Sequence, residues 1–224
     1  MRFSILAATL GYGLSMTAVG GTPADPVMRP PVEQLPPPLL HAKEDLHALV
    51  ARRDMDALLA RVRPETKLDF GGGEGPDGFQ SAWNSDQESR QRLWSTLEGI
   101  LALPGVARDF DHGAEYCAPY VFCTGWPGDL DPFEALVVLG SGVAIRDRPS
   151  LSGTVLTRVD HAVLTASDDP ASVPTPDWTR VRLADGTAGY INNRWVRSPI
   201  DFRFVLRVDD GTDAWWLGFL LAGD

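Results

Sequence analysis

The chain has little cysteine, and its basic side chains are outnumbered by acidic ones. Its 224 residues include two cysteines, too few for a disulfide-framework mini-protein or a four-cysteine zinc module. Thirty Asp and Glu against twenty Lys and Arg give a formal charge of -10, which repels phosphate and anionic lipid. We therefore expect no nucleic-acid partner. The hydrophobic content of 44% is sufficient for a packed core and excludes global disorder.

Long apolar runs are also absent. The run from Ile5 to Leu14 follows Arg2, and the small residues Ala18 and Gly20 stand where a signal peptidase reads the chain. This layout is typical of a secretory signal peptide, here over residues 1–21, and the run is shorter than the ~20 residues that cross a membrane. We expect a periplasmic or secreted protein with no membrane span after signal cleavage.

Residues 22–38 hold seven prolines. Proline at this density favours an extended, semi-rigid polyproline II conformation over a packed helix or strand. We interpret the segment as a linker between the signal peptide and the folded part of the chain.

Residues 39–136 read as an α+β domain. Apolar residues recur at helical spacing between Leu39 and Arg63, where Asp54 is expected to cap a second helix and Pro64 to end it. A short strand is expected over residues 67–70, and further helices over residues 77–83 and 93–101. Aromatic and β-branched residues rise over residues 107–138, which predicts strands and loops.

The C-terminal segment, residues 198–224, reads as one hairpin that turns at residues 209–211. A lone hairpin is marginally stable in water, and this one carries several aromatic residues that require burial: Phe202, Phe204, Trp215, Trp216 and Phe219. We therefore expect the hairpin to complete a curved antiparallel sheet in the domain of residues 39–136. The predicted fold class is α+β, with a small all-β unit, residues 137–197, inserted between the two parts.

The inserted unit consists of short apolar runs separated by turn residues. Asp185-Gly186 is a strong hairpin signal between the runs 181–183 and 189–191. The segments V-A-I-R-D-R-P-S (143–150) and W-T-R-V-R-L-A-D-G-T-A-G-Y-I-N-N-R-W-V (178–196) resemble the opening and closing parts of a bacterial SH3-like (SH3b) domain. The resemblance implies a barrel of five or six strands over residues 137–197.

The match to this domain is closer in its second half. There the turn glycine, the hairpin and the aromatic residues fall in register, whereas Ala144 replaces a usual polar residue and Asp160 a usual glycine. Residues 168–176 form an insertion. The flanks, with Phe70-Gly71-Gly72 and the tail from Ser198, resemble exported bacterial proteins that carry this domain, which implies a compartment but no activity.

Related SH3-like domains bind peptides or cell-wall muropeptides in shallow aromatic grooves. Aromatic faces beside amide donors suit an extended peptide. The resemblance therefore gives a set of candidate ligand-binding residues at the end of the last hairpin and on neighbouring strands: Arg146, Trp178, Tyr190, Asn192, Asn193 and Trp195. The alternative is that Trp178 and Tyr190 only fill the barrel core.

Cys117 and Cys123 are expected to form a disulfide, because two cysteines usually pair in an oxidising compartment. Six residues of extended strand span ~20 Å, but a disulfide needs Cα atoms within ~7 Å. Pairing therefore requires a turn at Ala118-Pro119. The alternative is two buried thiols acting as small hydrophobic side chains.

No catalytic, metal or cofactor motif emerges from the sequence. A cysteine hydrolase needs a nucleophile at a helix start with a partner histidine, and neither cysteine has this setting. The residues 71–75 are glycine-rich but lack the lysine and Ser/Thr of a phosphate loop. A loop metal site at Asp109, Asp111 and His112 is a weak alternative. We expect no cofactor and no resident metal.

These observations predict a non-catalytic, exported cell-envelope protein whose SH3-like domain binds a peptide, a peptidoglycan fragment or an envelope protein. A second hypothesis is a peptidoglycan-processing or small-molecule enzyme with a polar pocket between residues 39–135 and the tail. A third is a protein inhibitor or scaffold that acts through the loop of residues 168–176.

Overall fold

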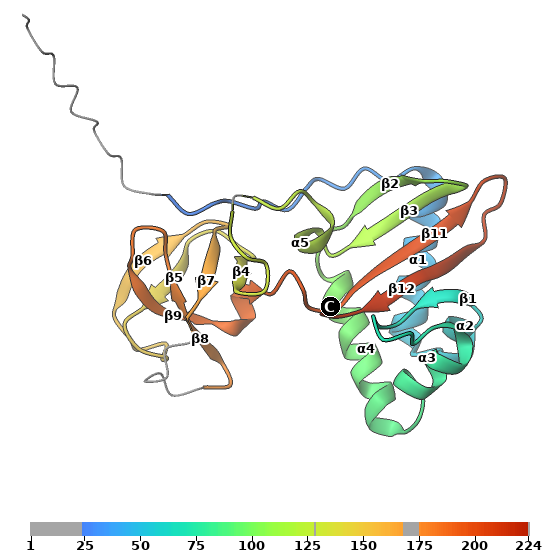
Figure 1. The fold of residues 1–224 in the computed structure, drawn as a ribbon, viewed down its shortest axis with the longest axis horizontal. Helices are drawn as coiled ribbons and strands as arrows, with labels where there is room; N and C mark the ends of the chain where they lie inside the picture. Colours follow the sequence, from blue (N-terminus) through green and yellow to red (C-terminus); the bar gives the residue numbers. More distant parts are fainter. Residues whose placement is uncertain (1–23, 128, 168–174, 224) are drawn as a thin grey trace, which may run out of the picture.

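The computed structural model describes residues 24–127, 129–167 and 175–223, which form two lobes (Figure 1). Each lobe is built around its own sheet, so the chain is α+β as expected. The expected signal peptide lies outside the described residues, as does most of the predicted insertion. None of the helices in the described ranges has the length and apolar character needed to cross a bilayer.

The first lobe contains the helices α1 (Pro37–Arg52), α2 (Met55–Leu59), α3 (Gly75–Trp83), α4 (Gln87–Leu101) and α5 (Tyr120–Cys123). The Asp54 side chain accepts a 3.1 Å hydrogen bond from the Ala57 amide, which confirms the predicted cap. At the start of α4, Asp86 and Ser89 form a reciprocal capping box.

The expected strand over residues 67–70 is wrong. Strand β1 runs over Val62–Lys67, and Pro64 lies inside it rather than ending a helix. Strand β1 lies at the edge of the sheet and has one neighbouring strand. Pro64 lacks a backbone N–H, and an edge strand tolerates this because no second strand needs that donor.

The sheet of the first lobe confirms the predicted role of the tail. Its strand order is β1-β12-β11-β3-β2, with β2 (Val106–Phe110) and β3 (Gly113–Ala118) from the N-terminal part, and β11 (Arg203–Asp209) and β12 (Trp215–Leu221) from the tail. Strand β12 pairs antiparallel with β11 but parallel with β1, so the sheet is mixed rather than antiparallel as predicted. The two ends of the chain therefore build one sheet.

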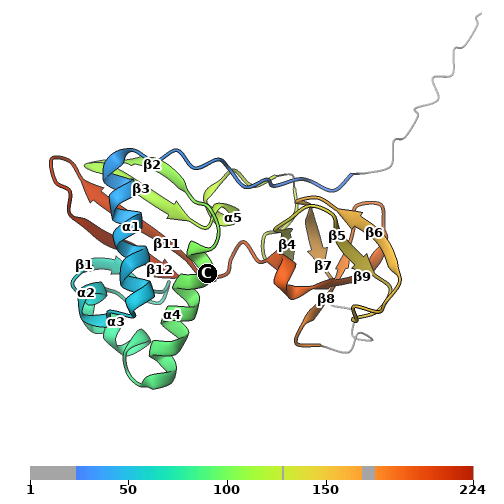
Figure 2. The ribbon, with the colours of Figure 1, turned by 180° about the vertical axis from the view of Figure 1, so that it is seen from behind.

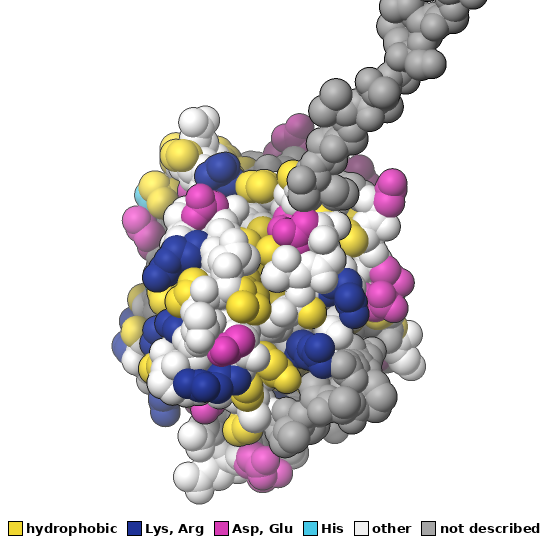
Figure 3. All heavy atoms as spheres, turned by 90° about the vertical axis from the view of Figure 1, so that its left-hand side faces the viewer, with side chains coloured by type: hydrophobic (Ala, Val, Ile, Leu, Met, Phe, Trp, Pro, Cys, Tyr) yellow, Lys and Arg dark blue, Asp and Glu magenta, His cyan; other side chains and the backbone are white. Residues whose placement is uncertain are grey.

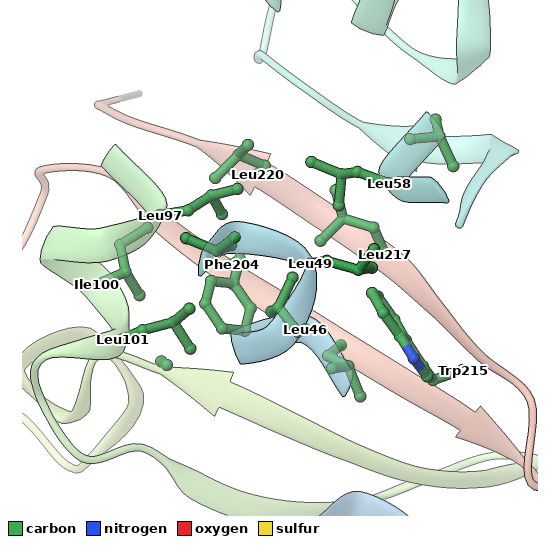
Figure 4. Packing of buried hydrophobic residues seen from close by; sticks show 14 of the residues in the cluster. Leu46, Leu49, Leu58, Leu97, Ile100, Leu101, Phe204, Trp215, Leu217 and Leu220 are labelled. Atoms are coloured by element: carbon green, nitrogen blue, oxygen red, sulfur yellow. The ribbon is translucent and has the colours of Figure 1, made fainter. Parts of the chain in front are cut away.

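The core of this lobe lies between the sheet and α1 to α4, which cover one face only (Figure 2). Leu46 and Leu49 of α1 and Ile100 of α4 point toward Phe204 and Leu217 of the tail strands (Figure 4). Each of these side chains is at most 2% exposed. Burial of the tail is thus what closes the N-terminal core.

The opposite face of the sheet has stacked arginine and aromatic side chains. The Arg207 guanidinium lies 4.2 Å from the ring centroid of Phe110 and 5.3 Å from that of Trp216, and Arg63 lies 4.5 Å from Trp216. A Cβ atom at Gly218 would come within 3.1 Å of Arg207, so glycine at this position lets the guanidinium lie flat on the sheet.

A disulfide joins Cys117 and Cys123, with Cα atoms 5.7 Å apart. The chain turns between them at Ala118-Pro119, through a cis peptide bond and the short helix α5. This is the turn that the predicted disulfide between Cys117 and Cys123 requires. Both cysteines pack against Val205 of β11 on the face that the long helices leave uncovered.

The second lobe is a seven-stranded antiparallel sheet of order β10-β4-β7-β8-β9-β5-β6. The strands are β4 (Ala135–Val138), β5 (Val143–Arg146), β6 (Val155–Val159), β7 (Val163–Ala166), β8 (Trp178–Arg182), β9 (Ala188–Asn192) and β10 (Val196–Arg197), with a 3-10 turn η1 (Asn193–Trp195). The sheet encloses its own apolar core, which includes Ile145, Val181 and Ile191. The predicted turn between β8 and β9 is present, with Gly186 at φ 87°.

Residues 24–36 form an extended segment that contacts both lobes, which we call the N-terminal strap. On the second lobe, the Asp25 carboxylate accepts a 2.6 Å hydrogen bond from the Ala184 amide, and Met28 donates to the His161 carbonyl. On the first lobe, Glu33 accepts hydrogen bonds from Lys43, the Tyr116 hydroxyl and the Gly105 amide. The predicted linker is extended over residues 24–36, but Pro37 and Pro38 belong to α1 rather than to the linker, and the extended part does not stand free of the lobes.

Candidate functional site

A pocket of about 210 Å³ lies in the second lobe. Its walls come from the β4–β5 turn, the adjoining parts of β5, β6 and β8, the β5–β6 loop, and the end of β9 with η1. We call it the arginine groove, and its lining residues are Ser141, Gly142, Val143, Ala144, Arg146, Leu151, Arg158, Trp178, Asn192, Arg194 and Trp195.

Four of the six predicted ligand-binding residues line this groove: Arg146, Trp178, Asn192 and Trp195. Strand pairing brings them together, because Trp178 at the start of β8 stands opposite Asn192 at the end of β9. The Asn192 side chain accepts a hydrogen bond from the Arg194 amide and so begins the 3-10 turn that presents Trp195. The exposed fraction of Trp195 is 41%, unusually high for tryptophan.

The other two predicted residues lie outside the groove lining. Asn193 accepts a 2.7 Å hydrogen bond from the Thr179 hydroxyl and donates a 3.0 Å bond to the Pro176 carbonyl, so it ties η1 to β8. Tyr190 lies in the middle of β9, opposite Arg180 and Arg146, and is half-buried. Asn193 thus has a structural role in positioning Trp195.

Two arginines that the sequence reasoning missed complete the groove. Arg158 on β6 stands opposite Ala144 on β5, and its guanidinium donates a 2.6 Å hydrogen bond to the Gly142 carbonyl. Arg194 lies with its guanidinium 5.0 Å from the Trp195 ring centroid. The alternation on β5, with Val143 and Ile145 buried, places Ala144 on the outer face and would have indicated its hairpin partner Arg158.

The groove is basic in an acidic protein. Among the described residues, three arginines and no carboxylate line it, and Arg146 donates a 2.6 Å hydrogen bond to the Gly153 carbonyl. Figure 3 shows one face of the second lobe, on which basic, acidic and hydrophobic side chains are interspersed. Arginine presents a planar fork of five donors, and one bond to a carbonyl leaves donors available. Such a site offers hydrogen bonds, positive charge and indole faces to a ligand.

A second pocket, of about 270 Å³, lies between residues 121–133 and the connection that leads into β11. Phe122, Trp126, Phe133 and Ile200 form much of its lining, and Arg203 is the charged residue at its wall. No carboxylate, imidazole or thiol is among the described residues that line it. This pocket is thus apolar.

Two other pockets between residues 39–135 and the tail are polar: one of about 240 Å³ is lined by Arg92, Ser95 and Asp201, and one of about 230 Å³ by Lys67, Asp69, Glu74 and Leu221. The enzyme hypothesis, which requires a polar pocket, therefore stays a prediction.

In the part of the chain that the structure describes, no group of three or more His, Cys, Asp or Glu side chains is arranged to hold a metal ion. Asp109, Asp111 and His112 therefore do not form such a group. No family model, no curated protein sequence and no solved structure matches the chain. The geometry of the arginine groove is therefore the feature that indicates a function.

Proposed function

We propose that the second lobe is an SH3-like barrel, and that the protein is a non-catalytic, exported cell-envelope protein that binds a peptide or peptidoglycan fragment through the arginine groove. Seven short antiparallel strands around a closed apolar core support the barrel. One observation carries the binding role: four residues chosen from the sequence pattern converge on one pocket, with Trp195 left exposed.

The ligand chemistry follows from the groove walls. Trp178 and Trp195 provide aromatic faces, and Asn192 and the arginines provide hydrogen-bonding groups, a combination that suits the backbone of an extended peptide. An exposed tryptophan beside arginine is the side-chain combination that dominates binding energy in many interfaces.

A pull-down on purified peptidoglycan sacculi tests the proposal, using the chain from Asp25. We expect saturable retention, and a Trp195→Ala variant should bind about tenfold more weakly or worse, because a central tryptophan commonly contributes at least this much. Phe133→Ala is the matched control, since Phe133 is an exposed aromatic residue outside the groove. It should bind like the wild type.

Mass spectrometry of the supernatant separates binding from turnover. Released muropeptides would contradict the non-catalytic role and favour the enzyme hypothesis. Absence of both retention and products would contradict wall binding and leave a protein partner as the ligand of the barrel.

A further inference from the structure

We infer that the arginine groove is specific for a peptide that ends in a free carboxylate. The inference rests on the proposed function, because it names the class of ligand for the same groove. Three arginines at the groove, rather than the aromatic residues found from sequence, carry the argument.

The first observation is the uneven distribution of charge along the chain. Residues 135–197 contain seven arginines, six aspartates and no lysine or glutamate, a formal charge of +1. The rest of the chain therefore has a formal charge of -11, which together with +1 gives the total of -10. Of the seven arginines, three line one pocket, and none of the described residues in its wall is acidic. The nearest carboxylate contact is that of Asp160, which accepts a 2.5 Å hydrogen bond from the Gly142 amide of the wall. An acidic protein has thus gathered three guanidinium groups at a single site.

The second observation is that these guanidinium groups are held but not neutralised. Arg146 and Arg158 donate to the Gly153 and Gly142 carbonyls, and Arg194 stacks on Trp195. Among the described residues, no carboxylate forms a salt bridge with any of the three. Arginines with fixed stems and free donors are prearranged for an anion, and guanidinium matches a carboxylate with two parallel hydrogen bonds.

The third observation is size. Pockets for drug-sized ligands usually have about 300–1,000 Å³, and the groove has about 210 Å³. It therefore accommodates a short end of a chain better than a long internal segment. The Trp178 and Trp195 rings flank this space, so side chains next to the carboxylate would lie against indole. A short peptide with a terminal carboxylate matches the positive charge of the groove, its volume and its aromatic walls.

Two acetylated alanine tetrapeptides that differ only at the C-terminus test the inference: one ends in a carboxylate and the other in an amide. Both are titrated into the ¹⁵N-labelled chain from Asp25, and the indole N–H signals of Trp178 and Trp195 are followed. The acid should bind about tenfold more tightly than the amide, since hydrogen bonds to a charged group are roughly twice as strong as neutral ones. Added salt should weaken the binding of the acid.

Substitutions assign the preference to the groove. The double variant Arg158→Gln/Arg194→Gln should lose the preference for the acid, and Arg158→Lys should keep part of it because the charge remains. Arg182→Gln removes an exposed arginine of β8 outside the groove, and it should bind like the wild type. Native near-UV circular dichroism of each variant establishes that the barrel is folded.

The outcomes separate this inference from the proposed function. Equal binding of acid and amide, with both shifting Trp195, would overturn the carboxylate specificity and leave peptide binding intact. A further titration adds inorganic phosphate as a competitor of the acid tetrapeptide for the groove. Displacement by phosphate as effective as displacement by excess acid tetrapeptide would overturn the carboxylate specificity, because the groove would then bind anions in general. No shift of either indole signal by either peptide would overturn both.

Discussion

At the scale of single residues, Glu33 is the most informative side chain outside the groove. It comes from the strap, and its carboxylate accepts hydrogen bonds from Lys43, from the Tyr116 hydroxyl at 2.6 Å and from the Gly105 amide at 2.7 Å. Burial alone would raise its pKa, but these hydrogen bonds outweigh burial and lower the pKa below its usual value. Burial and the bond to Glu33 raise the pKa of Tyr116 in turn.

The lowered pKa of Glu33 predicts a pH dependence of stability. A carboxyl group with a depressed pKa in the folded state stabilises the protein above its unfolded pKa, about 4.3, and loses this contribution as pH falls through the folded value. Glu33→Gln should therefore lower Tm most at neutral pH, by about 2–6 °C for a loss of roughly 1–2 kcal/mol. The difference from wild type should shrink below about pH 4.3 in thermal melts recorded from pH 3 to 7.

Glu98→Gln is the control for this experiment, because Glu98 is exposed and its ion pair with Arg53 is 3.8 Å long. It should leave Tm nearly unchanged. A Glu33→Gln difference that stays constant from pH 3 to 7 would show that the charge of Glu33 does not stabilise the fold.

The residues of the groove show how far sequence reasoning reaches at this scale. Trp178, Asn192 and Trp195 were predicted from the resemblance to SH3-like domains, and the hairpin at Asp185-Gly186 sets the register that brings Trp178 of β8 opposite Asn192 of β9. Arg158 was missed because it reaches the groove from β6, whose pairing with β5 follows a loop without a strong turn signal. The alternation on β5 indicates Arg158 only when the register of the β5–β6 hairpin is known, and the sequence of the loop does not set that register.

At the scale of elements, the tail hairpin is the strongest constraint. The requirement to bury its aromatic residues predicted that β11 and β12 would join the N-terminal domain, and the sheet confirms this. The parallel pairing of β12 with β1 was not predicted, because Pro64 suggested a helix end rather than an edge strand. The first strand of the second sheet, β4, begins at Ala135, two residues before position 137, where the barrel was expected to start.

Deleting residues 199–224 should unfold the first lobe. The deletion removes the strands that pair with β1 and β3, together with Phe204, Leu206 and Leu217 from the shared core. Loss of even one such side chain commonly costs about 2–5 kcal/mol. Hydrogen exchange should show unprotected amides in β3 and α4 but continued protection at Ile145 and Val181, which belong to the separate core of the second lobe.

Removal of Gly223 and Asp224 alone is the control for this deletion, and it should leave the exchange pattern of α4 and β3 unchanged. A chain truncated at residue 198 that keeps native protection in α4 would contradict the dependence of the first lobe on the tail.

At the scale of the whole molecule, the strap connects the two lobes. Met28 is 4% exposed and lies in a cluster with Tyr120 and Val121 of α5 and with Val137 and Val163 of the second sheet. The lobes therefore share a small apolar interface that the strap completes. The proline content predicted the extended conformation of this segment but not its binding partners, which depend on the tertiary positions of Val163 and Tyr116.

Met28→Asp should uncouple the lobes. A charge buried without a partner is costly, so the strap should leave the interface. Calorimetry of the wild type should show one cooperative transition, and the variant should show two that correspond to the separate lobes. Val32→Asp is the matched control within the strap, since Val32 is 86% exposed, and it should unfold like the wild type. A Met28→Asp variant with an unchanged single transition would contradict the coupling.

The parallel pairing of β1 with β12 also determines when each lobe is able to fold as the chain emerges from the ribosome or from a translocation pore. All residues of the second lobe have emerged by Arg197. Helix α1 packs against Leu217 and Leu220, which follow the end of this helix by more than 150 residues and so emerge last. The middle of the chain is therefore free to fold first while both ends remain open. Since contacts of such sequence separation form slowly, the N-terminal helices pass through a period in which their apolar faces are uncovered, and completion of the last strand ends it.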